Sequence, residues 1–252
     1  MSPDPRRVAV TRPGEAGRRL VAALRDSGCE AIHLPGLELA PVVDTGHAAA
    51  ALRRCLDADL WLLTSPNAVR FARELLGGDW PAGSGPRFAA PGEATAAALV
   101  TSGIARERVL VPRAGYTSEA LLRLPELKQM AGRQVVILNA AGGRGLLQNE
   151  LAARGAAVES VHVYRRVPPR LDTDALRTLE HGGDFTTVWT SASAMAELRA
   201  LLPAACWRNL LAGRQVVPSA RLEAEIRGHG AESVVLASAP DNDALRQAVL
   251  AQ

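Results

Sequence analysis

The chain has few cysteines. Its three, Cys29, Cys55 and Cys206, lie far apart in 252 residues and outside any CxxC or Cys/His spacing. Neither a zinc site nor a disulfide framework is therefore expected, and no metal is predicted. We expect all three to be small buried side chains in a reducing compartment.

Long apolar stretches are absent as well. No run reaches the roughly 18 residues that would cross a bilayer. The segment Met1 to Arg7 has no apolar core of the kind found in a secretory signal. We therefore expect a cytoplasmic protein with no membrane partner.

Aromatic residues are scarce, at 4% of the chain, and the net charge of +3 comes mainly from arginines scattered along the sequence. A surface that binds nucleic acid would favour a basic stripe interleaved with aromatic side chains. We therefore expect no nucleic-acid partner, whereas small anionic ligands remain possible.

Familiar catalytic and nucleotide-binding motifs are also missing. The sequence has no GxSxG, HExxH or GxxxxGK[ST] pattern. Gly142-Gly143-Arg144-Gly145 resembles a phosphate-binding loop only weakly, because a dinucleotide fingerprint needs GxGxxG and the position three after Gly145 is Gln148. A tight turn is the alternative interpretation of this segment.

What the chain does contain is an internal duplication. Thr64 to Val69 opens a helical pattern after a short apolar run, and Thr190 to Met195 does the same 126 positions later. Two further pairs keep nearly this offset: Val8–Gly28 with Val135–Gly155, and Phe88–Gly103 with Val216–Gly230. Three matches at one period predict two similar lobes with a cleft between them.

Short β-branched and aliphatic runs alternate with helical patterns throughout, which is typical of parallel βαβ units. Five strands are expected in each repeat, over 8–11, 31–35, 60–64, 87–90 and 108–111, then 135–139, 158–163, 187–190, 214–218 and 233–236. Helices are expected around Leu20 and Leu24 and over 68–76, 95–101, 119–124, 146–154, 175–181, 194–202, 222–227 and 244–250. The predicted fold class is α/β, with two doubly wound five-stranded parallel sheets.

Proline-marked linkers follow the second strand of each repeat, at Pro41 and at Pro168-Pro169. They favour a discontinuous first domain of residues 1–37 and 168–252 and a second domain of residues 41–164, with linkers at 38–40 and 165–167. Contiguous lobes are the alternative that the sequence alone permits.

Polar residues concentrate where expected strands end and helices begin. They are Thr11-Arg12, Thr64-Ser65, Gly92 with Thr95, Asn139 with Gly142 to Gly145, Thr190-Ser191 and Ser219. Ligands of open parallel sheets bind at these ends, where helix N-termini offer unpaired N–H groups. Ordinary helix capping is the alternative for each residue taken alone.

Tyr164 is one of only two tyrosines and ends an expected strand, at the point where the chain crosses between lobes. A tyrosine hydroxyl is a protonated donor at neutral pH, which suits a general acid. The alternative is a linker tyrosine that packs its ring and exposes its hydroxyl to water.

The chain resembles the uroporphyrinogen-III synthase family from end to end. Each matching motif is short, and it is their order and spacing that are specific. The motifs are Thr11-Arg12-Pro13, Leu34-Pro35, Pro41, Thr64 to Val69, Gly92 to Ala96, Ser118 to Leu122, Gly143-Arg144, Leu151, Gly155-Ala156, Val163 to Arg166, Thr190-Ser191, Ser219 and Arg221-Leu222.

The resemblance implies two doubly wound domains joined by a two-stranded linker, the first made from both chain ends. It also implies a lyase reaction without a cofactor, on the small-molecule partner hydroxymethylbilane, a linear tetrapyrrole. The terminal hydroxyl of this substrate leaves as water to give an azafulvene. The last ring then attacks through its substituted carbon, and a spiro intermediate recloses as uroporphyrinogen III.

Residue roles follow from the same resemblance. Tyr164 matches a tyrosine proposed to help the hydroxyl leave, and Thr95 matches a threonine of the cleft, so both are candidate catalytic residues. The candidate substrate-binding residues are Thr11, Arg12, Thr64, Ser65, Gly92, Arg144, Thr190, Ser191 and Ser219. Three positions depart from the family pattern: Asn139 stands at a frequent arginine, Pro91 at an aliphatic residue and Ala220 at a frequent glutamate.

The chemistry agrees with this resemblance. A substrate with eight carboxylates needs amide and hydroxyl donors and few acids, and an azafulvene is already electrophilic. The protein must mainly fold the substrate into one pose and exclude water, for which lobe closure is a natural means.

Other functions stay open: a nucleotide- or phosphosugar-using α/β enzyme, a non-catalytic two-lobed anion-binding protein, and a regulatory relative without activity. No exposed heptad or apolar edge indicates an oligomer, so a monomer is expected.

Overall fold

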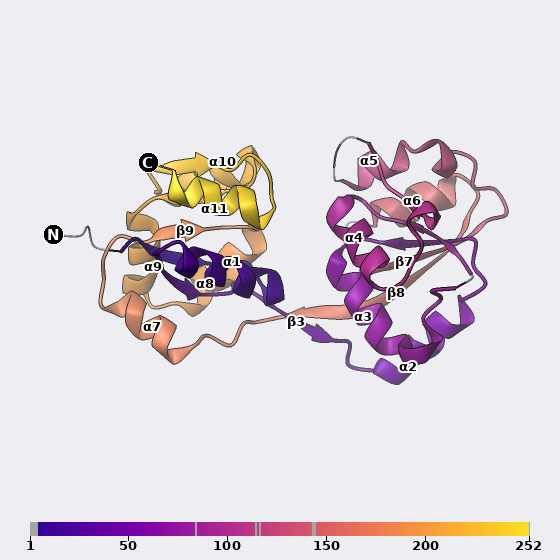
Figure 1. The fold of residues 1–252 in the computed structure, drawn as a ribbon, viewed down its shortest axis with the longest axis horizontal. Coiled ribbons are helices and arrows are strands. Elements are labelled where there is room, and N and C mark those ends of the chain that lie inside the picture. The colour runs from indigo at the N-terminus through magenta and orange to yellow at the C-terminus, as the bar shows by residue number, and fades with distance from the viewer. Residues whose placement is uncertain (1–4, 84, 114, 116, 143–144, 252) are drawn as a thin grey trace. The chain divides into compact units, whose positions relative to one another are not determined.

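Two separate parallel sheets organise the chain in the computed structural model, which describes residues 5–83, 85–113, 115, 117–142 and 145–251. Unit 1 comprises Met1–Leu39 and Val167–Gln252, and unit 2 comprises Ala40–Arg166 (Figure 1). Among the described residues, no helix has the length and apolar character needed to cross a membrane.

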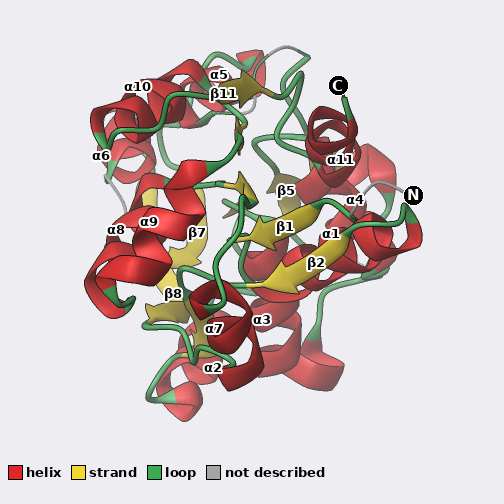
Figure 2. Ribbon diagram, turned by 90° about the vertical axis from the view of Figure 1, so that its left-hand side faces the viewer, coloured by secondary structure: helices red, strands yellow, loops and turns green. Residues whose placement is uncertain are grey.

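The sheet of unit 1 has the strand order β11-β10-β9-β1-β2. Its strands are β1 (Arg7–Val10), β2 (Glu30–His33), β9 (Thr186–Val188), β10 (Gln215–Val217) and β11 (Val234–Leu236). All four neighbouring pairs are parallel, and the arrows of β1 and β2 point the same way in Figure 2. Parallel strands are buried on both faces, and this is why they read as continuous apolar runs in the sequence.

Helices cover both faces of this sheet because successive strand residues point to opposite sides. Val8 and Val10 pack with α1 (Gly14–Asp26) and α11 (Asn242–Leu250). Ala9, between them, belongs to the core on the other face. That face is covered by α7 (Thr173–Glu180), α8 (Ala192–Leu201), α9 (Ala204–Ala212) and α10 (Ala220–Gly228).

The sheet of unit 2 has the order β3-β8-β7-β4-β5-β6. Its strands are β3 (Glu38–Pro41), β4 (Leu60–Leu63), β5 (Arg87–Ala89), β6 (Val109–Leu110), β7 (Gln134–Ala140) and β8 (Ala157–Val167). The pairs that link β8, β7, β4, β5 and β6 are parallel.

Helices flank this sheet too, with α5 and α6 on one side of β7 and α2 and α3 on the other (Figure 1). Leu60, Leu62 and Ile137 pack against α5 (Ser118–Leu122) and α6 (Leu146–Ala153). The remaining helices are α2 (Thr45–Arg54), α3 (Pro66–Leu76) and α4 (Glu93–Thr101), with short 3-10 turns at Gly77–Asp79, Arg106–Arg108 and Pro125–Leu127.

The two sheets share one topology, which confirms the predicted α/β fold class and the duplication, although β3 makes the sheet of unit 2 six-stranded and not five-stranded as predicted. Reading β7, β8, β4, β5 and β6 of unit 2 as counterparts of β1, β2, β9, β10 and β11 of unit 1 gives the same spatial order in both sheets. This is the doubly wound order 2-1-3-4-5, in which ligands bind at the switch point between the first and third strands. The switch points are therefore β1/β9 in unit 1 and β7/β4 in unit 2.

Three elements were not expected from the sequence. Helix α2 buries mainly alanines, which give a weak apolar signal, and α9 follows α8 after only Leu202 and Pro203. Strand β3 ends at Pro41, so its segment was interpreted as a linker, and it occupies the edge of the sheet, where a proline is tolerated.

Candidate functional site

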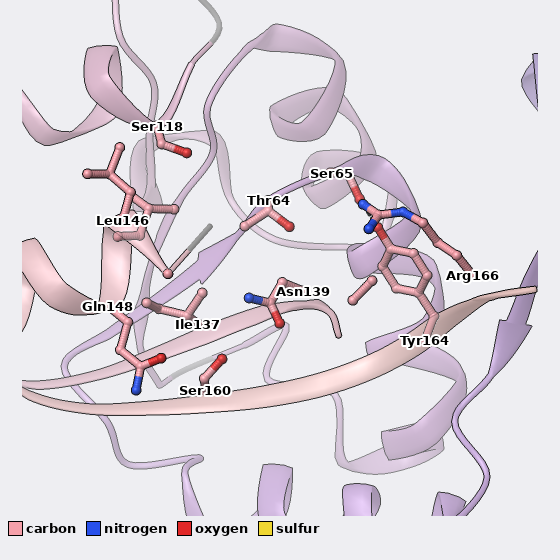
Figure 3. A pocket seen from close by; sticks show the side chains of 13 residues that line it. Thr64, Ser65, Ser118, Ile137, Asn139, Leu146, Gln148, Ser160, Tyr164 and Arg166 are labelled. Atoms are coloured by element: carbon pink, nitrogen blue, oxygen red, sulfur yellow. Dashed lines mark hydrogen bonds between the residues drawn. The ribbon is translucent and has the colours of Figure 1, made fainter. Parts of the chain in front are cut away.

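A cavity of about 260 Å³ opens at the switch point of unit 2, where β4 and β7 end. We call it the switch-point pocket. Its described lining residues come from strand ends, helix starts and β8: Thr64, Ser65, Ser118, Ile137, Asn139, Ala140, Gly145, Leu146, Leu147, Gln148, Ser160, Tyr164 and Arg166 (Figure 3).

Thr64 and Ser65 enter the pocket because they lie between β4 and α3. The Thr64 hydroxyl donates to the Leu138 carbonyl of the adjacent strand at 3.3 Å. Ser65 has extended backbone angles and caps α3, with its Oγ accepting from the Ala68 N–H at 3.1 Å. An apolar strand that ends in Thr-Ser before a helix therefore brings two hydroxyls to the switch point.

Tyr164 brings its hydroxyl to the same place from β8. Its Oη lies 3.2 Å from Ser65 Oγ. Its ring stacks on Phe71 of α3, with centroids 5.3 Å apart and planes 12° from parallel, and the residue is only 5% exposed. The Tyr164 ring is thus held in one orientation by its packing on Phe71 and by the hydrogen bond of its hydroxyl with Ser65.

Asn139 lies at the end of β7 next to His162 of β8. Their Oδ1 and Nδ1 atoms are 2.7 Å apart. The strand register shifts immediately afterwards, because Asn139 pairs with His162 but Ala140 pairs with Tyr164. Irregular pairing of this kind re-aims side chains, and here it occurs beside the pocket.

The electrostatics of the pocket favour anions. Arg166 is the one ionisable group with a formal charge at neutral pH among its described lining residues, and none of these is a carboxylate. The first turns of α3 and α6 add the partial positive charge of helix N-termini. Within the described part of the chain, no cluster of three His, Cys, Asp or Glu side chains could hold a metal ion.

A second cavity of about 250 Å³ shares Thr64, Ser118 and Leu147 with the first. Its other lining residues are mainly apolar, with one hydroxyl from Thr117: Leu62, Pro91, Thr117 and Leu121. The site therefore continues along the strand ends into a second cavity that also mixes hydroxyl and apolar side chains.

The strand-end residues of unit 1 lie at the carboxyl end of its sheet, where Thr11, Thr190 and Ser191 follow the switch-point strands β1 and β9, and Ser219 follows the neighbouring β10. Thr11 is fully buried, and its hydroxyl donates to the Val188 carbonyl at 2.9 Å, so this hydroxyl is used within the protein. Ser191 caps α8 through the Ala194 N–H, and Thr190 directly precedes it after β9. Ser219 caps α10 through the Leu222 N–H.

Arg12 is held firmly at this end of β1. Its Nη1 donates to the Pro240 carbonyl at 2.7 Å. Burial lowers the pKa of its guanidinium, while the nearby charge of Asp241 opposes that shift. Its backbone carbonyl lies 2.8 Å from His33 Nε2, and α1 approaches so closely that a Cβ on Gly17 would lie 1.9 Å from this carbonyl oxygen.

Two other expected site residues, Gly92 and Thr95, lie apart from the described lining of the switch-point pocket. Gly92 is the N-cap of α4, and Thr95, only 3% exposed, is buried in its first turn. Neither is among the described residues that line the pocket. Arg144 lies outside the described residues.

Sequence reasoning did not select Ser118, Gln148, Ser160 or Arg166 as site residues. A signal existed for Arg166, because it lies two residues after Tyr164 and so shares its face of β8. Ser160 lies before the register shift and pairs with Ile137, whereas Tyr164 pairs with Ala140, so spacing along the strand does not place Ser160 on the face of Tyr164. Ser118 and Gln148 come from the starts of α5 and α6, and their approach to the pocket depends on how these helices pack.

Comparisons with known proteins agree with one another. A family model described as uroporphyrinogen-III synthase HemD matches residues 18–247. The chain is 35% identical to uroporphyrinogen-III synthase of Escherichia coli K12, over 96% of this chain and 99% of the relative. The Salmonella typhimurium enzyme of the same name is 36% identical over the same shares.

Solved structures support the fold. Uroporphyrinogen-III synthetase of Helicobacter pylori aligns with a TM-score of 0.61 at 14% identity, covering 95% of this chain and 96% of that one. A mutant uroporphyrinogen III synthase of Thermus thermophilus aligns with a TM-score of 0.58 at 22% identity, covering 96% of each chain.

Proposed function

This chain belongs to the uroporphyrinogen-III synthase family, and we propose that its switch-point pocket holds the reacting end of hydroxymethylbilane during ring closure. The enzyme is a cyclising lyase of tetrapyrrole and heme biosynthesis. The reaction removes water, inverts the last ring of the substrate and gives uroporphyrinogen III.

The observation that carries this proposal is the contact between Tyr164 and Ser65. The phenol lies 3.2 Å from Ser65 Oγ, and Ser65 Oγ already accepts an N–H from α3. When the serine hydrogen points at the phenol oxygen, the phenolic hydrogen is free to face the pocket. Tyr164 can then donate to the departing hydroxyl of the substrate, and the helix N-terminus stabilises the phenolate left behind.

The composition of the pocket supports a polycarboxylate ligand. Hydroxyls, amides and Arg166 line it, and no described lining residue is acidic. An acidic lining residue would repel each substrate carboxylate, and this repulsion would grow as water leaves the pocket. Apolar side chains in the adjoining cavity, Leu62, Pro91 and Leu121, offer surface for a pyrrole ring.

The remaining candidates are proposed as further donors. In unit 2 these are Thr64, Gly92, Arg144 and Thr95, the last acting with Tyr164 in catalysis. In unit 1 they are Thr11 through its backbone, Arg12, Thr190, Ser191 and Ser219. The reaction needs no cofactor, and we propose that the chain works in the cytoplasm as a monomer.

One experiment tests the function directly. The purified chain is given freshly generated hydroxymethylbilane, the product is oxidised, and the isomers are separated by chromatography. We expect predominantly the type III isomer. Predominantly type I product, which forms by unaided closure, would reject the proposal, and tight binding without turnover would identify an anion-binding protein instead.

A further inference from the structure

We propose that His162 is a positioning residue that turns the amide nitrogen of Asn139 into the switch-point pocket, where it donates to a carboxylate oxygen of the substrate. This inference rests on the function proposed above and identifies one means by which unit 2 recognises its anionic ligand. His162 itself lies beside the pocket and acts through Asn139.

The pair is built into the sheet. Asn139 and His162 are direct partners in the register of β7 and β8, and the side-chain contact of 2.7 Å links them across the strands. Asn139 is half-buried and lines the pocket, whereas His162 is exposed. The histidine therefore has no core to stabilise, and its described polar contact is with Asn139.

The contact determines which end of the amide faces the ligand. An amide has one accepting oxygen and one donating nitrogen. A histidine protonated at Nδ1 donates to Asn139 Oδ1 and leaves both amide hydrogens for other partners. Among the described residues, Asn139 Nδ2 has no protein hydrogen-bond partner, and Figure 3 shows this nitrogen pointing toward the neighbouring pocket side chains.

The duplication shows what is distinctive about this position. Val8 matches Val135, and the same offset matches Arg12 with Asn139. At matched positions, unit 1 thus has the guanidinium of Arg12 at the end of β1, whereas unit 2 has the neutral amide of Asn139 at the end of β7. A neutral donor needs a fixed orientation to bind an anion, because it lacks the long-range attraction of a charge.

The test compares three single variants and one double variant by initial rates of type III formation. His162→Leu removes the contact, while His162→Asn keeps an N–H donor near the position of Nδ1. We expect His162→Leu to raise KM about three- to tenfold with kcat within about twofold, as for one lost hydrogen bond in binding. His162→Asn should keep KM within about twofold of the unaltered chain.

Asn139→Ala should raise KM to a similar extent, and adding His162→Leu to it should change KM no further, because both act through one contact. Equal effects of His162→Leu and His162→Asn, additive effects in the double variant, or an unchanged KM in His162→Leu would each overturn the proposal.

Nitrogen NMR of the His162 ring supplies a measurement that needs no turnover. We expect the neutral ring to carry its proton on Nδ1 and to lose that preference in Asn139→Ala. A proton on Nε2 in the unaltered chain would overturn the proposal, because the amide oxygen would then face the ligand. Failure of the proposed function appears separately, as type I product from the unaltered chain.

Discussion

At the residue scale, the hydroxyl of Tyr164 can be removed without disturbing its surroundings. Tyr164→Phe keeps the ring stacked on Phe71 and loses only the contact with Ser65. A positioned general acid typically contributes 10²- to 10⁴-fold to a rate. We therefore expect initial rates of type III formation to fall by about 100-fold, with a melting temperature close to that of the unaltered chain.

Ser219→Ala is the matched control, since it removes a hydroxyl at another strand end. Because catalysis depends largely on positioning, we expect it to slow the reaction far less and to leave activity measurable. A loss as large as that of Tyr164→Phe would contradict the proton-donor role.

Cys55 gives a prediction about stability. Its thiol donates to Glu159 Oε2 at 3.2 Å, and burial, this hydrogen bond and the charge of Glu159 raise its pKa from 9.0 to about 11. Between these values the unfolded chain loses the proton while the folded chain keeps it. The free energy of unfolding therefore falls as pH rises from about 9 to about 11, by at most about 1.4 kcal/mol per pH unit from this group.

Cys55→Ser keeps a donor for Glu159 but does not ionise in this range. In urea unfolding at pH 8, 9, 10 and 11, we expect the stability of this variant to decline less steeply above pH 9 than that of the unaltered chain. Parallel curves for the two proteins would show that Cys55 does not cause the decline.

At the scale of elements, the same cap occurs at equivalent helices of both units. Ser65 and Ser191 each accept an N–H three residues later at 3.1 Å. Loss of such a cap costs about 1 kcal/mol, so Ser65→Ala and Ser191→Ala should lower the free energy of unfolding alike. Ser65 also contacts Tyr164, and we therefore expect Ser65→Ala alone to lower kcat by about three- to tenfold.

Urea unfolding and initial rates, measured on both variants, check this prediction together. An equal fall of kcat in Ser191→Ala would mean that the contact with Tyr164 has no special role in the reaction.

Most elements could be predicted from the sequence because their apolar periods are clear. The strands of parallel sheets appear as short apolar runs, and amphipathic helices such as α1 and α3 follow them. Helix α2 was missed because its buried face consists of Ala48, Ala49, Ala51 and Leu52, and three alanines with one leucine give a weak apolar signal. Strand β3 depends on pairing with β8, which no local pattern reveals.

At the scale of the whole molecule, topology explains why part of the pocket was foreseeable. Thr64 and Ser65 follow one strand of a switch point, a place where ligands bind in any doubly wound sheet. Gln148 and Ser118 reach the pocket through the packing of α6 and α5. The contact of Asn139 with His162 depends on strand register, which involves residues far apart in the sequence.

Unit 1 is built from both ends of the chain and unit 2 from the segment between them, and this has a consequence for folding. Unit 2 is one continuous stretch with its own core, and β3 and β8 at its two ends are neighbours in its sheet. We expect a protein of residues 38–167 to fold alone, with helical and strand signals in far-ultraviolet circular dichroism and one cooperative thermal transition. It should form no type III isomer, because unit 1 and its strand ends are missing.

A fragment of residues 168–252 is the matched comparison, because it lacks β1, β2 and α1. Strand β9 would then lose β1, one of its two neighbours, and Val188 would lose the packing of Leu20 and Leu24. We expect no cooperative transition from this fragment, since an unpaired apolar edge favours aggregation over folding. A cooperative transition in 168–252 would show that the first two strands are not what completes unit 1. The absence of a cooperative transition in 38–167 would show that unit 2 does not fold alone.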